Sequence, residues 1–222
     1  MIIPFSALAS TDCPGSHCAN IGFAYNKFCM KISLAGQSSL LVGPGGEACY
    51  CPCSCVSSDT KVLLEGGLEL PFFRLSEADK PVSPFRFETK NSGHLMSNPV
   101  KNYPAYLVRF SNGKLIQDIH NHTLIEPNMK SVKVSELSNG QVIVAAVGEN
   151  VSVISIDPRS SYTGEMQNMV VNKTSIRPLD HLIVTNGLVS GDFLLQARSD
   201  TLKRSIDLRL DNLEVFDIQT EN

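Results

Sequence analysis

Four cysteines occupy alternate positions immediately before an apolar run. They lie in "CYCPCSCVSSDTKVLLEGG", residues 49–67, and are Cys49, Cys51, Cys53 and Cys55. Alternate side chains of an extended chain project to one face, so the cluster could bind a soft metal. Zinc sites, however, usually use cysteine pairs separated by about two to four residues, and disulfides between positions two apart would be strained. Residue types alone therefore leave two readings of Cys55 open, a structural or metal-bound thiol and a nucleophile.

The cysteines divide the chain into two compositions. All seven of them lie within the first 55 residues of the 222, and the segment that contains them is rich in Gly, Ser and Pro. The remainder has no cysteine and is rich in Val, Ile and Leu. An odd number of cysteines leaves at least one thiol unpaired if the others form disulfides within the chain. Cys55, at the junction, is the candidate for that thiol.

Charge and hydropathy argue against a nucleic-acid partner and against a membrane span. The formal charge is −3, from 19 basic and 22 acidic residues, so the chain has no basic footprint for a nucleic acid. No run approaches the roughly 18 apolar residues of a membrane span, which predicts no transmembrane segment. The opening "MIIPFSALAS" lacks a basic n-region and is not expected to be a signal peptide.

Short β-branched runs separated by turn signals predict an all-β fold after Thr60. Gly66-Gly67, Asn112-Gly113 and Asn186-Gly187 each separate two apolar runs and predict hairpins. Helix is expected to be scarce. Only "PFFRLSEADK" and the closing "FLLQARSDTLKRSIDLRLDNLEVF" permit a helix, and the second could equally be a polar tail that packs on a sheet.

Two stretches of this β region combine histidines with apolar runs. His120 and His122 lie in "NGKLIQDIHNHTLIEP", and His181 lies in "LDHLIVTNGLVSGDF". By themselves, two histidines two apart are usually surface residues of a strand or a weak metal pair. A lone histidine such as His181 is more often a buried core or turn residue than a catalyst.

Taken in order, these stretches resemble the Hint family, which comprises the self-processing domains of hedgehog proteins, inteins and bacterial intein-like domains. "CVSSDTKVLLEGG" is similar to the opening block, whose first residue is a cysteine nucleophile, and "NGKLIQDIHNHTLIEP" to the block that ends in T-x-x-H. "YTGEMQNMVV" and "HLIVTNGLVSGD" resemble the closing blocks. The resemblance covers about residues 55–192 and implies a horseshoe of short antiparallel strands.

The resemblance implies a chemistry for the bond between Ser54 and Cys55. Cys55 would attack the carbonyl of Ser54 and exchange the amide for a thioester, an N-to-S acyl shift. Resonance makes the amide nitrogen a poor leaving group, so the fold must strain the bond and supply a proton. By similarity, His122 donates that proton, and His181 positions the site or activates the next nucleophile.

The chain departs from the family pattern at the T-x-x-H threonine. Ile119 stands three residues before His122, and its apolar side chain cannot hydrogen-bond the strained amide. We expect Asp118, His120 or Asn121 to take over this role, or the first step to be slower. Asp118 is therefore added to the predicted catalytic residues.

The second departure is at the other end. Inteins close with His-Asn followed by Cys, Ser or Thr, because the Asn cyclises and the next residue accepts the upstream segment. The matching positions here are Gly191, Asp192 and Phe193. An ionised Asp cyclises poorly and Phe has no nucleophile, so full protein splicing is not expected.

The resulting prediction is N-terminal autocleavage or acyl transfer by a domain of residues 55–192, with a cysteine-rich segment 1–54 and a tail 193–222. The substrate would be the chain's own N-terminal segment and the acceptor water or a thiol, with Cys53 as a candidate internal acceptor. Transfer to a sterol is disfavoured because the charged tail offers no apolar lipid site. No cofactor and no metal are expected for this reaction.

Three alternatives remain. The first is a Hint-like domain that has lost activity and serves as a structural or interaction module. The second is metal binding by the cysteine cluster, and the third is a Cys-His protease acting on other proteins, which is disfavoured because nothing marks a substrate groove. The sequence does not assign a compartment; the resemblance adds an expectation of export, and the cysteine-rich segment is compatible with an oxidising one.

Overall fold

A computed structural model describes residues 40–42, 48–50, 56–76, 78–84, 94–119, 121–146, 148–172, 175, 177–202 and 205–211. The chain forms two compact units, one of Met1–Cys53 with Val215–Asn222 and one of Ser54–Glu214. In the first unit, β1 (Leu40–Val42) pairs antiparallel with β2 (Ala48–Tyr50). The predicted scissile pair Ser54 and Cys55, together with Cys51, Cys53 and His120, lies outside the described residues.

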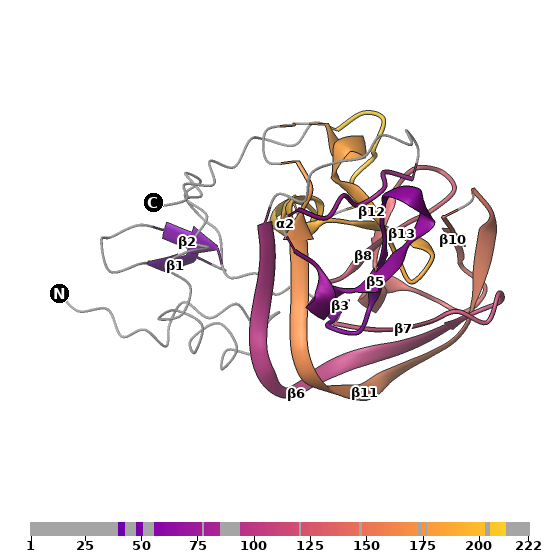
Figure 1. Ribbon diagram of the computed structural model, residues 1–222. Coiled ribbons are helices and arrows are strands. Elements are labelled where there is room, and N and C mark those ends of the chain that lie inside the picture. Colours follow the sequence, from indigo (N-terminus) through magenta and orange to yellow (C-terminus); the bar gives the residue numbers. More distant parts are fainter. Residues whose placement is uncertain are drawn as a thin grey trace. The chain divides into compact units, whose positions relative to one another are not determined.

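The unit Ser54–Glu214 is built from two antiparallel sheets (Figure 1). The first has the order β10 (Val142–Val144), β11 (Asn150–Val170), β3 (Val56–Ser57), β7 (Leu115–Asp118) and β6 (His94–Phe110), and β11 also pairs with β6. The second has the order β5 (Glu69–Pro71), β4 (Lys61–Leu63), β12 (Leu182–Thr185), β13 (Leu188–Gly191), β8 (Thr123–Ile125) and β9 (Ser131–Lys133). The all-β prediction is confirmed.

Helix in the described part of the unit is limited to one α-helix and short 3-10 turns. They are η2 (Glu65–Gly67), η3 (Phe72–Arg74), η4 (Val134–Glu136), η5 (Pro178–His181) and α2 (Phe193–Leu202). The helix-permissive stretch that begins at Pro71 forms only the short η3. The first ten residues of the closing stretch do form a helix, α2.

The three predicted hairpins are confirmed. Gly66-Gly67 joins β4 to β5, Asn112-Gly113 joins β6 to β7, and Asn186-Gly187 joins β12 to β13. The last turn is the clearest case, because Asn186 and Gly187 both have positive φ, 48° and 74°. These are the residue types that a two-residue turn of this hand requires.

Two strands are much longer than the apolar runs in the sequence indicate. β6 has 17 residues and β11 has 21, and they run side by side as a long curved ribbon (Figure 1). The register of β11 on β6 shifts three times, including once between Asp157 and Ser160, where Pro158 lies. Such irregularities let a strand bend and admit a proline, which would otherwise remove a ladder hydrogen bond.

The start of α2 belongs to the core. Phe193, Leu194 and Leu195 are buried, and Leu195 packs in one apolar cluster with Ile206 and Leu208. Further members of this cluster come from β8, β10, β12 and β13. The segment after Asp192 thus supplies apolar surface to the second sheet, and its first turn enters the polar site.

Candidate active site

The strand β3 places the residue that follows Cys55 in the middle of the first sheet. Val56 is buried and pairs with Asp118 of β7 on one side and Gln167 of β11 on the other. Thr60 then closes the turn out of β3, since its N–H donates to the carbonyl of Ser57 at 2.9 Å. Cys55 itself is not described. Val56, the next residue, lies directly beside Asp118 of β7.

Asp118 and His122 form a buried pair beside this strand. Each side chain is 1% exposed, and His122 Nε2 lies 3.6 Å from Asp118 Oδ2. A turn in which the His122 N–H donates to the Ile119 carbonyl at 3.1 Å brings the two side chains together. Neither Asp118 Oδ1 nor His122 Nε2 has a hydrogen-bond partner among the described residues. An unpaired buried polar group is costly, so such atoms are often functional.

Burial makes both members of this pair neutral near pH 7. It raises the pKa of Asp118 from 3.8 to about 8, with a further increase from the charge of Asp59 and a decrease from a hydrogen bond to the backbone of Ser57. Burial lowers the pKa of His122 from 6.5 to about 3. Water stabilises the charged form of each group, and its loss disfavours ionisation. A protonated carboxyl and a neutral imidazole can both donate a proton to a departing amine.

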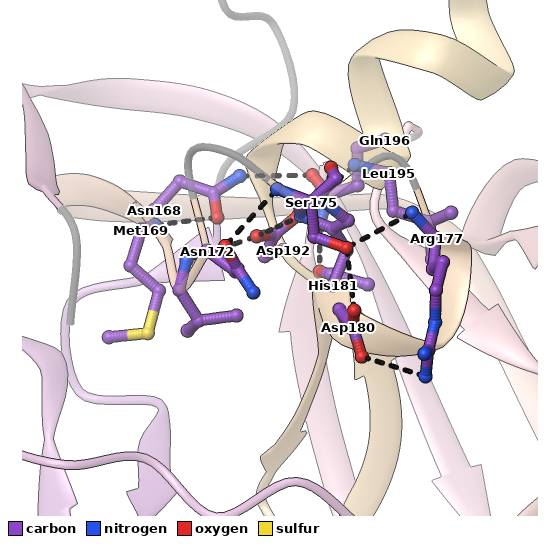
Figure 2. A network of polar contacts seen from close by, with 12 residues as sticks. Asn168, Met169, Asn172, Ser175, Arg177, Asp180, His181, Asp192, Leu195 and Gln196 are labelled. Carbon is purple, nitrogen blue, oxygen red and sulfur yellow. Dashed lines mark hydrogen bonds and ion pairs between the residues drawn. The ribbon is translucent and has the colours of Figure 1, made fainter. Parts of the chain in front are cut away.

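The other ring nitrogen of His122 contacts α2. Its Nδ1 is 3.0 Å from Nε2 of Gln196, which also donates to the Gly191 carbonyl at 2.7 Å. Gln196 Oε1 accepts a hydrogen bond from Asn168 Nδ2 of β11 at 3.0 Å (Figure 2). All four of these residues are buried.

His181 contacts the start of α2 through Asp192. Its Nδ1 is 2.9 Å from Asp192 Oδ2, and its Nε2 is 2.9 Å from the Ser175 carbonyl (Figure 2). The Asp192 carboxylate also accepts the backbone N–H groups of Val171 and Leu195, each at 3.1 Å. Three contacts from different elements thus hold this carboxylate in place.

Asp192 is also the N-cap of α2. Its Oδ1 accepts from the N–H of Leu195, and its carbonyl accepts from the N–H of Gln196 at 3.1 Å, the first bond of the helix. This pattern is the usual one for an N-cap aspartate. The first turn of α2 thus contacts both predicted histidines, His181 through Asp192 and His122 through Gln196.

The predicted site residues are partly brought together. Asp118 and His122 are adjacent, whereas His181 contacts Asp192 and the Ser175 carbonyl. Ile119 is half-buried and packs against Tyr103 and Met166. Sequence reasoning missed Gln196 and Asn168. The signal that could have found them is an amide side chain inside an otherwise apolar run, in "FLLQ" and in "NMVV".

The described residues show neither a metal site nor a membrane-spanning helix. No group of three or more His, Cys, Asp or Glu side chains is placed to hold a metal ion there. Among the described helices, none is long and apolar enough to cross a membrane. The cysteine cluster up to Cys55 lies largely outside these residues.

Comparisons with known proteins identify a fold. No family model and no curated protein matches the chain. Among solved structures it is similar to the gp41-1 intein, with TM-score 0.50 and 14% identity over 63% of this chain and 98% of that one. It is also similar to a DnaB intein from Synechocystis sp. PCC 6803, with TM-score 0.51 and 16% identity over 63% and 98%. Variant M86 of the Ssp DnaB mini-intein gives TM-score 0.51 and 16% identity over 63% and 94%. At this identity the likeness shows the fold: the chain has the Hint fold of the inteins.

Proposed function

We propose that the unit Ser54–Glu214 is a single-turnover self-processing domain that cleaves the chain between Ser54 and Cys55. The observation that carries the proposal is the buried pair Asp118–His122 beside Val56, the residue after Cys55, within an intein fold. Both side chains have a buried polar atom without a partner among the described residues. This arrangement costs stability and is explained if it acts on the neighbouring bond.

The proposed reaction has two steps. The Cys55 thiolate attacks the carbonyl carbon of Ser54, the C–N bond breaks, and the Cys55 nitrogen takes up a proton, which leaves a thioester between Ser54 and the Cys55 sulfur. Water or a thiol then attacks the thioester. Residues 1–54 leave as an acid or a new thioester, and Cys55 regains its thiol.

Asp118 and His122 serve the first step. At neutral pH the raised pKa of Asp118 keeps its carboxyl protonated, and the lowered pKa of His122 keeps its ring neutral. Each therefore carries one proton and no charge beside the start of β3. Proton donation to the departing nitrogen is what makes an amide expellable, and positioned donors contribute about 10²- to 10⁴-fold to such steps.

The reaction stops after N-terminal cleavage, because Asp192 is committed to other contacts. Its carboxylate is held by His181 and by two backbone N–H groups, and its backbone begins α2. Phe193, the next residue, is buried and carries no nucleophile. These contacts support autocleavage or acyl transfer without ligation.

A second candidate is an inactive Hint-like structural module. Ile119 favours it, since an apolar side chain packed on Tyr103 and Met166 replaces the threonine expected beside the strained amide. Metal binding by the cysteine cluster is the remaining alternative, and the metal content of the purified protein tests it.

The deciding experiment is the intact mass of freshly purified protein, with and without dithiothreitol or hydroxylamine, beside Cys55→Ala and His122→Ala variants. We expect fragments that meet between Ser54 and Cys55, formed faster with the added nucleophile and absent in Cys55→Ala. A chain that stays whole under every condition would leave the inactive module.

A further inference from the structure

A chain of amide groups leads from the backbone of β11 to His122. The Met169 N–H donates to Asn168 Oδ1 at 2.8 Å, and Asn168 Nδ2 donates to Gln196 Oε1 at 3.0 Å (Figure 2). Gln196 Nε2 then lies 2.7 Å from the Gly191 carbonyl and 3.0 Å from His122 Nδ1. Asn168, Gln196 and His122 are each no more than 1% exposed.

The direction of every hydrogen bond in this chain is fixed by two backbone groups. A backbone N–H can only donate, so the atom of Asn168 facing Met169 is its oxygen, and its NH₂ faces Gln196. A backbone carbonyl can only accept, so the atom of Gln196 facing Gly191 is its nitrogen. Rotating either amide by half a turn would place two donors or two acceptors against each other in a buried site, which costs about 1–3 kcal/mol for each unpaired group.

The tautomer of His122 follows from this polarity. Gln196 presents an N–H to Nδ1, so Nδ1 must accept and carries no proton. In a neutral imidazole the single proton is then on Nε2. This is the nitrogen that lies 3.6 Å from Asp118 Oδ2 and has no hydrogen-bond partner among the described residues.

We propose that Gln196 and Asn168 are positioning residues that hold His122 in the Nε2–H tautomer, with its proton on the side of Asp118. Protonation of Nδ1 would set a second N–H against the Gln196 amide, so the contact also opposes formation of the imidazolium. This opposition acts in the same direction as burial, which lowers the pKa of His122. The catalytic consequence rests on the proposed function; the tautomer itself does not.

Through Gln196, α2 takes part in the site, although it follows the segment 55–192 that resembles the Hint family. Gln196 reaches His122 across 74 positions of sequence, and Asn168 reaches Gln196 across 28. The amide chain also ties the second half of β11 to the turn that carries His122.

The test reads the tautomer directly by long-range ¹H–¹⁵N NMR of the His122 ring, in the full chain with Cys55→Ala to prevent processing. We expect a protonated Nε2 and an unprotonated Nδ1. Gln196→Glu replaces the donor with a carboxylate that can only accept, and should move the proton to Nδ1 or protonate both nitrogens. Gln117→Glu is the matched control, because Gln117 also donates to a backbone carbonyl, that of Ser161, away from His122. This control should leave the tautomer unchanged.

A protonated Nδ1 in the Cys55→Ala chain overturns the inference even if Gln196→Glu fails to fold. An unchanged tautomer in a folded Gln196→Glu chain overturns it as well. With Cys55 present, Gln196→Glu should slow fragment formation on the order of 10²-fold, the lower end of what a positioned proton donor contributes. Its rate should also acquire a dependence on pH from the ring. If the unaltered chain never cleaves, the proposed function fails while the NMR result still decides the tautomer.

Discussion

At the scale of single residues, the site is unusual in holding an acid and a base that are both uncharged. Asp118 and His122 lie next to each other, yet burial moves their pKa values in opposite directions, to about 8 and about 3. An ion pair between them would require each to ionise without water. The neutral pair keeps two protons available and leaves no fixed charge to stabilise the intact peptide bond.

The opposite pKa shifts predict a specific dependence of stability on pH. Asp118 binds its proton more tightly when folded, so its contribution to the free energy of unfolding is full below pH 3.8 and falls as pH rises toward 8. His122 binds its proton less tightly when folded, so its contribution is full above pH 6.5 and is lost as pH falls toward 3. The two slopes cancel between about pH 4 and 6.5, and stability should then fall by roughly 2 kcal/mol from pH 6.5 to 8.

Urea unfolding of Cys55→Ala at a series of pH values checks this dependence. In Asp118→Asn the fall above pH 6.5 should disappear, and a rise from about pH 3 to 6.5 should emerge. The same curve with and without Asp118→Asn would contradict the assigned pKa shift of this carboxyl.

Ile119 offers a second test at this scale. Ile119→Thr supplies a hydroxyl at the T-x-x-H position, and one added hydrogen bond of about 0.5–1.5 kcal/mol would speed the first step about 2- to 10-fold. Ile119→Val is the matched control, because valine has nearly the same shape as threonine and no hydroxyl. Fragment formation followed by intact mass should accelerate only in the threonine variant. Equal rates in the two variants would exclude this residue as the cause of a slow step.

At the scale of elements, the sequence predicts those features that depend on residues close together in the chain. The turn at Asn186-Gly187 and the motif that contains His122 are of this kind, and both could be predicted from the sequence. The length of β6 and β11 could not be predicted, since Pro99 and Pro158 interrupt the pattern and are accommodated at register shifts in the pairing. Gln196 was missed because its role comes from contacts 28 and 74 positions away. No periodicity contains such information.

The start of α2 depends on the Asp192 cap. Asp192→Ala removes a helix cap and leaves a buried histidine and two backbone N–H groups without their acceptor. Each buried donor left without an acceptor costs about 1–3 kcal/mol, so thermal or urea unfolding should show a loss of several kcal/mol. Asp79→Ala, which removes an acceptor for Ser76 N–H at an exposed turn, should cost no more than about 1 kcal/mol. Similar losses in both variants would mean that the Asp192 contacts add nothing beyond a surface turn.

Close packing between β13 and α2 is tested at Gly191. A Cβ at this position would lie 2.8 Å from Leu195 Cδ2 and 3.1 Å from Leu195 Cβ. Gly191→Ala should therefore cost about 1–3 kcal/mol of unfolding free energy by overpacking. Because the clash is with one side chain, the cost should shrink in a Leu195→Ala background. An unchanged cost there would place the strain elsewhere than between these two residues.

At the scale of the whole unit, the segment after Asp192 contributes both to the apolar core and to the candidate site. The described residues after Asp192 supply Phe193, Leu195, Ile206 and Leu208 to the core, all at most 2% exposed. Full burial of one such side chain is worth about 1.5–3 kcal/mol, so together they are comparable with the roughly 5–15 kcal/mol by which a domain is stable. The same segment contacts His122 through Gln196 and holds the Asp192 carboxylate, the partner of His181, through the Leu195 N–H. A unit that ended at Asp192 would lose these apolar residues and the Gln196 contact to His122 together.

Truncation tests whether the residues after Asp192 are needed for folding and processing, or whether residues 193–222 are a dispensable tail. A chain that ends at Asp192 should fail to give a cooperative unfolding transition and should form no fragments, because α2 and the apolar residues after it are missing. A chain that ends at Glu214, the last residue of the compact unit, should unfold cooperatively and process at the rate of the full chain. Circular dichroism and intact mass on both chains provide the comparison. Normal processing by the chain that ends at Asp192 would show that Gln196 is not required. Loss of processing in the chain that ends at Glu214 would assign a function to the last eight residues, 215–222.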